Sequence, residues 1–217
     1  QDISDAAFPY MACGQITVKG TRARLFRISF SGELAYEIAV PTRYGDAMIR
    51  ALVEAGREFD AVVYGTEALG VMRVEKGHVA GNELNGQSSA LNMGLGKMVS
   101  RKKDAIGMVL SQREGMTAPN GYRLVGVKPV NPAESLTAGA HFLAKGAEAV
   151  AANDGGWLTS VVYSPHLGHS IGLGYLKGGD TRKGERLRIV NLMAKTDVEV
   201  EIVSPHFFDP EGERLRG

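Results

Sequence analysis

Six short runs of β-type residues occupy the second half of this 217-residue sequence and restrict its fold more than any other feature. The runs are YRLVGVKPV (122–130), GAHFLA (139–144), WLTSVVYSP (157–165), HSIGLGYL (169–176), RLRIVNLM (186–193) and TDVEVEIVSP (196–205). Clusters rich in Pro, Gly, Asn and Asp separate them. Several short strands at regular spacing are typical of a barrel or a sandwich. We predict an all-β barrel domain over residues 113–217.

The first half of the sequence mixes helical and β-type patterns. Residues 21–30 and 33–40 flank a short link that contains Gly32, and the second run alternates apolar and polar residues, which predicts a β-hairpin. Residues 43–56 have a helical apolar stripe with Gly56 as a plausible end, 61–65 are typical of a short strand, and 66–76 predict a second helix. The order β-β-α-β-α predicts an α+β region, residues 1–112, with helices on one face of a small antiparallel sheet.

Composition excludes several classes of protein. The sequence is 44% hydrophobic and carries a net charge of +1, so no strong field draws it to nucleic acid or to a membrane surface. No apolar run approaches the ~20 residues of a membrane span. The single cysteine, Cys13, forms no disulfide within the chain, which favours a reducing, cytoplasmic location. Because the chain opens with Gln1 rather than Met, we expect it to be a piece of a longer protein.

Glu75 is the most informative polar residue. Ala68, Val71 and Met72 precede it by seven, four and three residues, and this spacing puts all four side chains on one helical face. A carboxylate on a buried face is costly unless it is paired or hydrogen-bonded. One interpretation is a ligand with two adjacent N–H donors, such as an aminopyrimidinone ring. The alternative is a glutamate at a frayed helix end that points to water or pairs with a neighbouring cation.

Two further residues have both an ordinary and a functional interpretation. Tyr36 lies on the apolar face of its expected strand, where it packs in the core or stacks on a ring. Arg123 lies at the start of the first strand of the expected barrel. It is either a surface charge, or its planar guanidinium group binds the anionic tail of a ligand. His166 and His169 lie three residues apart without a neighbouring Cys or carboxylate cluster, so we predict no metal site.

Several segments together resemble the aminomethyltransferase (glycine cleavage T-protein) family. SFSGELAYEIAVP resembles the family's TGE-x-GYE-I-VP hairpin, and ALGVMRVEKGHVAGNEL resembles its LR-E-G-x-G-EL helix and loop. GLGKMVSRKKDAIG is similar to its GLGW-x-KKDFIG segment, and GWLTSVVYSPHLGHSIGLGYL to its C-terminal domain. The segments occur in order over nearly the whole chain. Two segments resemble one branch of the family in particular, the C-terminal part of the alpha subunit of heterotetrameric sarcosine oxidase. They are YGTEALGVMRVEKGH and the final FFDPEGERLRG.

The resemblance implies a tetrahydrofolate-binding region of an oxidoreductase. In this branch a one-carbon unit from oxidised sarcosine passes to tetrahydrofolate and gives 5,10-methylenetetrahydrofolate. The family pattern implies that Glu75 contacts the pterin, that Tyr36 is the binding aromatic, and that Arg123 faces the glutamyl tail. The family's catalytic aspartate is expected upstream of Gln1. FAD, FMN and NAD are expected on other parts of the enzyme, whose partners are the rest of the alpha subunit and the beta, gamma and delta subunits.

Two alternatives remain open. The chain is similar enough to a free-standing aminomethyltransferase of the glycine cleavage system to be a truncated form of one. It also departs from the family in the stretch GQSSALNMGLG (86–96), where residues Gln87–Asn92 stand in place of the usual Thr-Pro and acidic residue before GLG. This departure favours a non-catalytic folate-binding relative, and it leaves open whether the loop holds the ligand in the usual way. We expect the isolated 217-residue chain to be inactive as an amine oxidase and to bind folate weakly or not at all.

Overall fold

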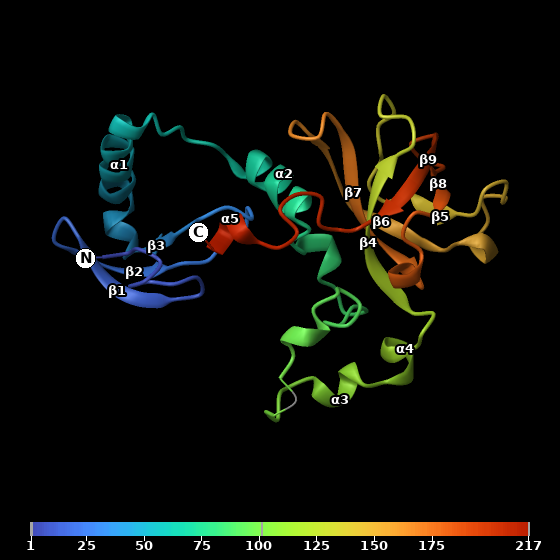
Figure 1. Ribbon diagram of the computed structural model, residues 1–217, viewed down its shortest axis with the longest axis horizontal. Helices are drawn as coiled ribbons and strands as arrows, with labels where there is room; N and C mark the ends of the chain where they lie inside the picture. Colours follow the sequence, from blue (N-terminus) through green and yellow to red (C-terminus); the bar gives the residue numbers. More distant parts are fainter. Residues whose placement is uncertain (1, 101, 217) are drawn as a thin grey trace. The chain divides into compact units, whose positions relative to one another are not determined.

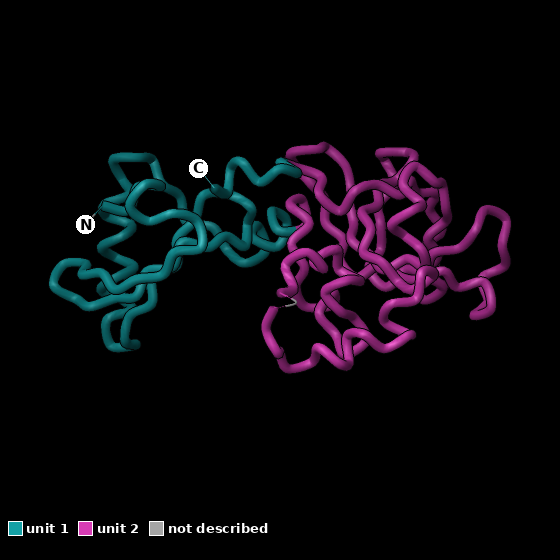
Figure 2. The backbone as a smooth tube through the Cα atoms, turned by 60° about the horizontal axis from the view of Figure 1, so that its bottom comes forward, with its two compact units in different colours: residues 1–73, 209–217 teal, residues 74–208 magenta. Residues whose placement is uncertain are grey.

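The computed structural model describes residues 2–100 and 102–216. The chain divides into two compact units, residues 1–73 with 209–217 and residues 74–208 (Figure 2), and each is described by itself. The boundary between residues 73 and 74 falls inside a helix. None of the helices in the described part of the chain is long and apolar enough to cross a membrane.

The first unit contains a three-stranded antiparallel sheet in the order β1-β2-β3 (Figure 1). The strands are β1 Cys13–Val18, β2 Thr21–Phe26 and β3 Glu37–Ala39. Lys19 and Gly20, both with positive φ, form the two-residue turn between β1 and β2. The predicted pairing of residues 21–30 with 33–40 is confirmed for three residue pairs, with Leu25 opposite Ile38. Strand β1 was not predicted from the sequence.

The helices of this part begin close to their expected positions. They are α1 Gly45–Gly56 and α2 Thr66–Lys76, with 3-10 turns η1 Thr42–Tyr44 and η2 Arg57–Phe59. The short helix α5 Glu213–Arg216 was not predicted. The strand predicted at residues 61–65 is wrong, because no strand among the described residues pairs with this segment and its apolar side chains are exposed, Val62 by 83% and Val63 by 80%. The observed order is therefore β-β-β-α-α. The α+β class is confirmed.

The second unit contains a closed six-stranded antiparallel barrel in the order β4-β7-β6-β5-β8-β9, as predicted (Figure 1). Its strands are β4 Tyr122–Pro129, β5 His141–Leu143, β6 Gly156–Ser164, β7 His169–Lys177, β8 Arg186–Asn191 and β9 Thr196–Val203. The barrel closes where β4 pairs with β9, for example Val127 with Ile202. Its interior is filled by apolar side chains from all six strands. They include Val125, Val127, Phe142, Leu158, Leu176, Leu187, Ile189, Val198, Val200 and Ile202.

A β-bulge in β6 decides which residues of this strand face outward. Leu158 pairs with Gly174 and Ser160 pairs with Leu173, so Thr159 is the extra residue. Its hydroxyl donates to the carbonyl of Leu173 at 3.0 Å. Because side chains alternate along a strand, the extra residue reverses the alternation. Leu158 and Val161 both pack into the barrel interior, and the serines at 160 and 164 lie on the outer face.

An outer layer covers part of the barrel. Residues 74–93 run from the end of α2 through the 3-10 turn η3 Gly81–Glu83. Val74, Val79 and Met93 of this segment pack on apolar side chains that β4 and β7 present outside the barrel. Those barrel residues are Leu124, Ile171, Leu173 and Tyr175. The remaining short elements of the unit are η4 Gly96–Met98, α3 Met108–Ser111, α4 Glu114–Thr117, η5 Ala151–Asn153 and η6 Gly179–Thr181.

Candidate functional site

Glu75 lies at the end of α2, where the chain turns at Gly77. Gly77 has φ +77°, and a Cβ at this position would lie 2.3 Å from the carbonyl oxygen of Pro205. The glycine therefore serves both a left-handed turn and a close approach of two backbone segments. The carbonyl oxygen of Glu75 accepts hydrogen bonds from the amides of Phe207 at 2.9 Å and Phe208 at 3.1 Å. These contacts hold the backbone of the predicted binding residue on the barrel unit.

Glu75 is 8% exposed, so most of the residue is shielded from water. The Ser164 hydroxyl donates a short hydrogen bond to Oε1, and the amide of Leu167 donates to the same hydroxyl oxygen at 3.0 Å. Within the described residues, Oε2 of Glu75 accepts no hydrogen bond, although a carboxylate oxygen has two acceptor positions. The carboxylate is thus half satisfied by the protein and keeps one oxygen for a donor from outside.

A second buried carboxylate, Glu83, lies on the same outer layer and was missed in the sequence analysis. It is 0% exposed, and both of its oxygens are used. Oε1 accepts from Ser160 at 2.6 Å and Oε2 accepts from the amide of Ala80 at 3.0 Å. The Tyr175 hydroxyl donates to the Glu83 carbonyl at 2.7 Å, and burial raises the pKa of that hydroxyl above its ordinary value. Ala80 lacks the side-chain oxygen that marks a capping box in a sequence, so the sequence carried no clear signal of this contact.

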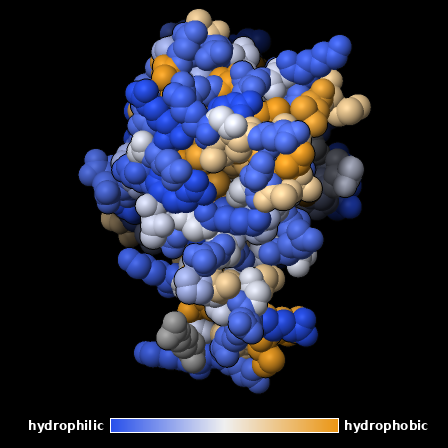
Figure 3. All heavy atoms as spheres, turned by 90° about the vertical axis from the view of Figure 1, so that its right-hand side faces the viewer, coloured by the Kyte–Doolittle hydropathy of each residue, from blue (hydrophilic) through white to orange (hydrophobic). Residues whose placement is uncertain are grey.

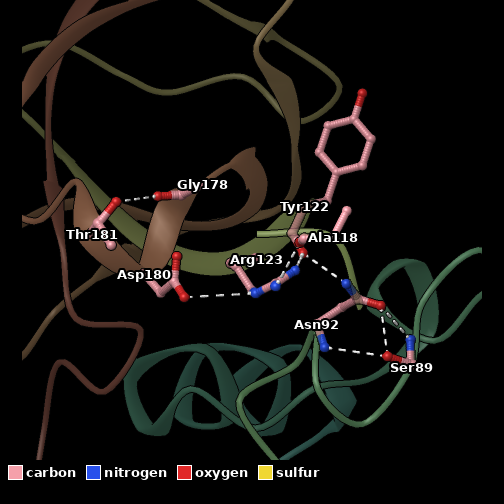
Figure 4. Close-up of polar contacts among 8 residues, drawn as sticks. All are labelled: Ser89, Asn92, Ala118, Tyr122, Arg123, Gly178, Asp180 and Thr181. Atoms are coloured by element: carbon pink, nitrogen blue, oxygen red, sulfur yellow. Dashed lines mark hydrogen bonds and ion pairs between the residues drawn. The ribbon is translucent and has the colours of Figure 1, made fainter. Parts of the chain in front are cut away.

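The loop that departs from the family pattern is fixed by its own polar residues (Figure 4). Asn92 Oδ1 accepts from both the amide and the hydroxyl of Ser89 at 2.8 Å. Its Nδ2 donates to the carbonyl of Tyr122 at 2.8 Å, and its carbonyl accepts from the amide of Leu124 at 2.8 Å. Residues Gln87–Asn92 are therefore attached to the start of β4 without the family's usual side chains.

Arg123 lies beside this loop and is buried (Figure 4). Its Nη1 donates to the Tyr122 carbonyl and its Nη2 to the Ala118 carbonyl, both at 3.0 Å, and its Nε lies 3.7 Å from Oδ2 of Asp180. The guanidinium therefore holds the turn before β4, which contradicts a freely exposed surface charge. Its predicted contact with an anionic tail stays a prediction.

Tyr36 belongs to the first unit, where it is half buried. Its hydroxyl donates to the Ile3 carbonyl at 2.8 Å, and the guanidinium of Arg27 lies 5.7 Å from the ring centre. Arg27 is completely buried, pairs with Asp5 and donates to the carbonyls of Phe8 and Arg216. Tyr36 thus packs beside a buried cation, and its predicted role in ring stacking stays untested.

A separate cavity of about 460 Å³ lies between η5 and the β8–β9 turn, and Glu75 is not among its lining residues. Leu143, Val190 and the exposed Met193 contribute apolar surface, and Nδ1 of His141 lies 3.1 Å from Oδ1 of Asp154. Figure 3 shows apolar side chains gathered among hydrophilic ones on the side of the molecule that faces right in Figure 1.

Within the described residues, no group of three or more His, Cys, Asp or Glu could hold a metal ion.

Comparisons with known proteins agree with this architecture. The model of the GCVT N-terminal domain matches residues 1–103, and that of the glycine cleavage T-protein C-terminal barrel domain matches residues 123–209. The sarcosine oxidase subunit alpha of Rhizobium meliloti (strain 1021) is 47% identical over 99% of this chain, which covers 22% of that protein. The corresponding subunit of Corynebacterium sp. (strain P-1) is 39% identical over the whole chain, again covering 22% of the relative.

More distant relatives are similar over a larger share of their own length. The aminomethyltransferase of Desulforamulus reducens is 26% identical over 89% of this chain and 51% of that protein. The crystal structure of the glycine cleavage system aminomethyltransferase T from Bartonella henselae aligns with a TM-score of 0.73 at 19% identity, over 96% of this chain and 56% of that one. The chain therefore spans about a fifth of the sarcosine oxidase alpha subunits it matches. It belongs to the glycine cleavage T-protein (aminomethyltransferase) family.

Proposed function

We propose that this chain is the folate-side part of a sarcosine oxidase alpha subunit and that Glu75 recognises the pterin ring of tetrahydrofolate. The identity of 47% to one such subunit, against 26% to an aminomethyltransferase, favours this branch of the family. We also propose that the two family domains divide at residues 112/113. The matched ranges, which end at 103 and resume at 123, support that division.

The half-satisfied carboxylate of Glu75 carries the proposal. The pterin ring presents adjacent N–H donors, and a carboxylate pairs with two such donors through its two oxygens. Oε2 is open, and Oε1 has a second acceptor position beside its bond from Ser164. A largely buried carboxylate is costly without donors, so a ligand that supplies two N–H donors gains hydrogen bonds to Glu75 that the protein alone does not provide.

The remaining proposed contacts come from the family pattern. Tyr36 would stack on the ligand and Arg123 would face the glutamyl tail, in addition to the structural contacts that each makes in its own unit. Tetrahydrofolate supplies the two nitrogens, N5 of the ring and N10 beside it, that take up the one-carbon unit as 5,10-methylenetetrahydrofolate. Glu75 would orient that ring. The family aspartate upstream of Gln1 would complete the site.

Oxidation of the amine belongs to other parts of the enzyme in this proposal. Side chains supply no hydride acceptor, so FAD, FMN and NAD would be held by the rest of the alpha subunit and by the beta, gamma and delta subunits. The isolated chain would release no hydrogen peroxide from sarcosine. We propose a cytoplasmic location for the assembly.

Titration calorimetry with tetrahydrofolate on the full-length protein tests the proposal. Glu75→Gln replaces one acceptor oxygen by a donor amide and opposes the donors of the ring. Hydrogen bonds to charged groups contribute roughly 1.5–3 kcal/mol, so we expect the affinity to fall about tenfold to a hundredfold. Glu83→Gln is the matched control, because both oxygens of Glu83 are engaged within the protein. An unchanged affinity in a folded Glu75→Gln protein rejects the proposal.

Two alternatives predict other results. A truncated aminomethyltransferase would occur without oxidase subunits, so purification of the native protein with no flavin-containing partner favours that assignment. A non-catalytic relative would bind folate without turnover, and the Gln87–Asn92 loop is its support. Folate binding by the full protein without formation of 5,10-methylenetetrahydrofolate from sarcosine favours it.

A further inference from the structure

We infer that Ser164 is a positioning residue for Glu75 and that, together with the amide of Leu167, it makes the site selective for a ring with adjacent N–H donors. The inference rests on the proposed function, since it explains how Glu75 is prepared for its ligand. Ser164 is the last residue of β6 and is completely buried.

The direction of the hydrogen bonds around Ser164 is fixed by its neighbours. The amide of Leu167 can only donate, so the hydroxyl oxygen accepts there. An ionised carboxylate can only accept, so the single hydroxyl hydrogen goes to Oε1 of Glu75. The relay therefore runs from Leu167 N–H through Ser164 O–H to Glu75, and each bond strengthens the other.

This relay has a consequence for ligand choice. With Ser164 donating to Oε1, the carboxylate is fixed in rotation about its last torsion, and Oε2 keeps one orientation. A ligand that brings donors meets an acceptor already in place, whereas a ligand that brings acceptors leaves the carboxylate unpaired and is rejected. The preorganised acceptor also needs no ordering when the ligand binds.

The β-bulge at Thr159 connects the relay to the fold. Because the extra residue reverses the alternation of β6, Ser160 and Ser164 both lie on the outer face, beneath the α2–η3 segment. Each serine donates to one glutamate of that segment. The Ser160–Glu83 pair leaves no carboxylate oxygen without a partner, whereas the Ser164–Glu75 pair leaves one open. Ser160 is therefore an internal control on the same strand.

The experiment compares the two serines in the full-length protein, with tetrahydrofolate as the titrant. Ser164→Ala should weaken binding about tenfold, which corresponds to about 1.4 kcal/mol. Ser164→Thr, which keeps the hydroxyl, should bind within about threefold of the natural protein. Ser160→Ala should lower the unfolding temperature and leave the affinity within about twofold. If Ser164→Ala does not fold, Ser164→Cys keeps the volume with a weaker donor and should show the same loss.

A double-mutant cycle separates a positioning role from general loosening of the site. In the Glu75→Gln background, Ser164→Ala should change the affinity by less than twofold, because there is no carboxylate left to orient. The inference is overturned if Ser160→Ala and Ser164→Ala lower the folate affinity equally. It is also overturned if the affinity losses of Ser164→Ala and Glu75→Gln add up in the double variant. If Glu75→Gln weakens binding and Ser164→Ala does not, the inference fails alone. If Glu75→Gln leaves binding unchanged, the proposed function fails, and this inference fails with it.

Discussion

Oγ of Ser160 lies 2.6 Å from Oε1 of Glu83, and Glu83 is completely buried. This pair attaches the segment after α2 to strand β6, and Oε2 of Glu83 accepts the amide of Ala80 as well. A buried carboxylate with both oxygens used is an anchor of the fold rather than an open binding group.

Glu83→Ala should therefore destabilise the protein. The change removes the Glu83 acceptor from the buried Ser160 hydroxyl and from the half-buried Ala80 amide, and a buried polar group that loses its acceptor costs about 1–3 kcal/mol. We expect the free energy of unfolding, measured with urea, to fall by about 2–5 kcal/mol. Glu83→Gln keeps one acceptor oxygen and should lose less. Equal and small losses in both variants would contradict the anchoring role.

Gly77→Ala should be much more costly than Gly81→Ala. Both glycines have positive φ, so both substitutions strain the backbone by a similar amount. Only at Gly77 would the new Cβ approach another backbone segment, at 2.3 Å from the Pro205 oxygen, whereas no atom lies within 4 Å at Gly81. We expect Gly77→Ala to lower the free energy of unfolding by at least about 1–3 kcal/mol more, the range of overpacking. If the free energy of unfolding falls by the same amount in both variants, the positive φ alone accounts for the destabilisation.

The barrel was predictable because its strands carry strong local signals. Each of the six runs is bounded by turn residues, and each becomes a strand of the closed sheet. The first part was predicted less well. Residues 61–65 have β-type composition, yet a strand needs a partner, and within the described residues none pairs with them. β1 was missed because it alternates only between exposed and half-buried positions, as expected of an edge strand.

The site was predictable only as far as one helix face extends. Spacing within α2 singled out Glu75, and its burial agrees with that interpretation. Ala68, expected on the same buried face, is exposed. The partner of Glu75 lies 89 residues away on β6, and the β-bulge that turns Ser164 outward depends on pairing with β7. Neither relationship leaves a periodic trace in the sequence.

Tyr175 provides a test of pH dependence. Burial raises the pKa of its hydroxyl above the ordinary value near 10. A group whose pKa is raised on folding contributes stability that is fully present below the unfolded pKa and is lost as pH rises through the folded pKa. Urea unfolding between pH 8 and 11 should therefore show that the free energy of unfolding falls more steeply with rising pH in the natural protein than in Tyr175→Phe. The variant keeps the ring and cannot titrate. Parallel curves for the two proteins would contradict this assignment.

The barrel should fold without the rest of the chain. A fragment of residues 120–208 contains all six strands, so its circular dichroism spectrum should be β-rich. This fragment lacks the segment 74–93, which covers Leu124, Ile171, Leu173 and Tyr175 on the outside of the barrel. Their apolar surface would be exposed, and a patch of this kind promotes dye binding and self-association.

A fragment of residues 74–208 restores that cover together with the anchor between Glu83 and Ser160. Burying a large apolar side chain contributes roughly 1.5–3 kcal/mol, so the longer fragment should be more stable by several kcal/mol and should not bind a hydrophobic dye. Glu83→Ala in the longer fragment is the matched control, because it should remove part of the gain without shortening the chain. A helical spectrum for the shorter fragment would reject the independent barrel. Equal stability and equal dye binding of the two fragments would show that the outer layer contributes nothing to the fold.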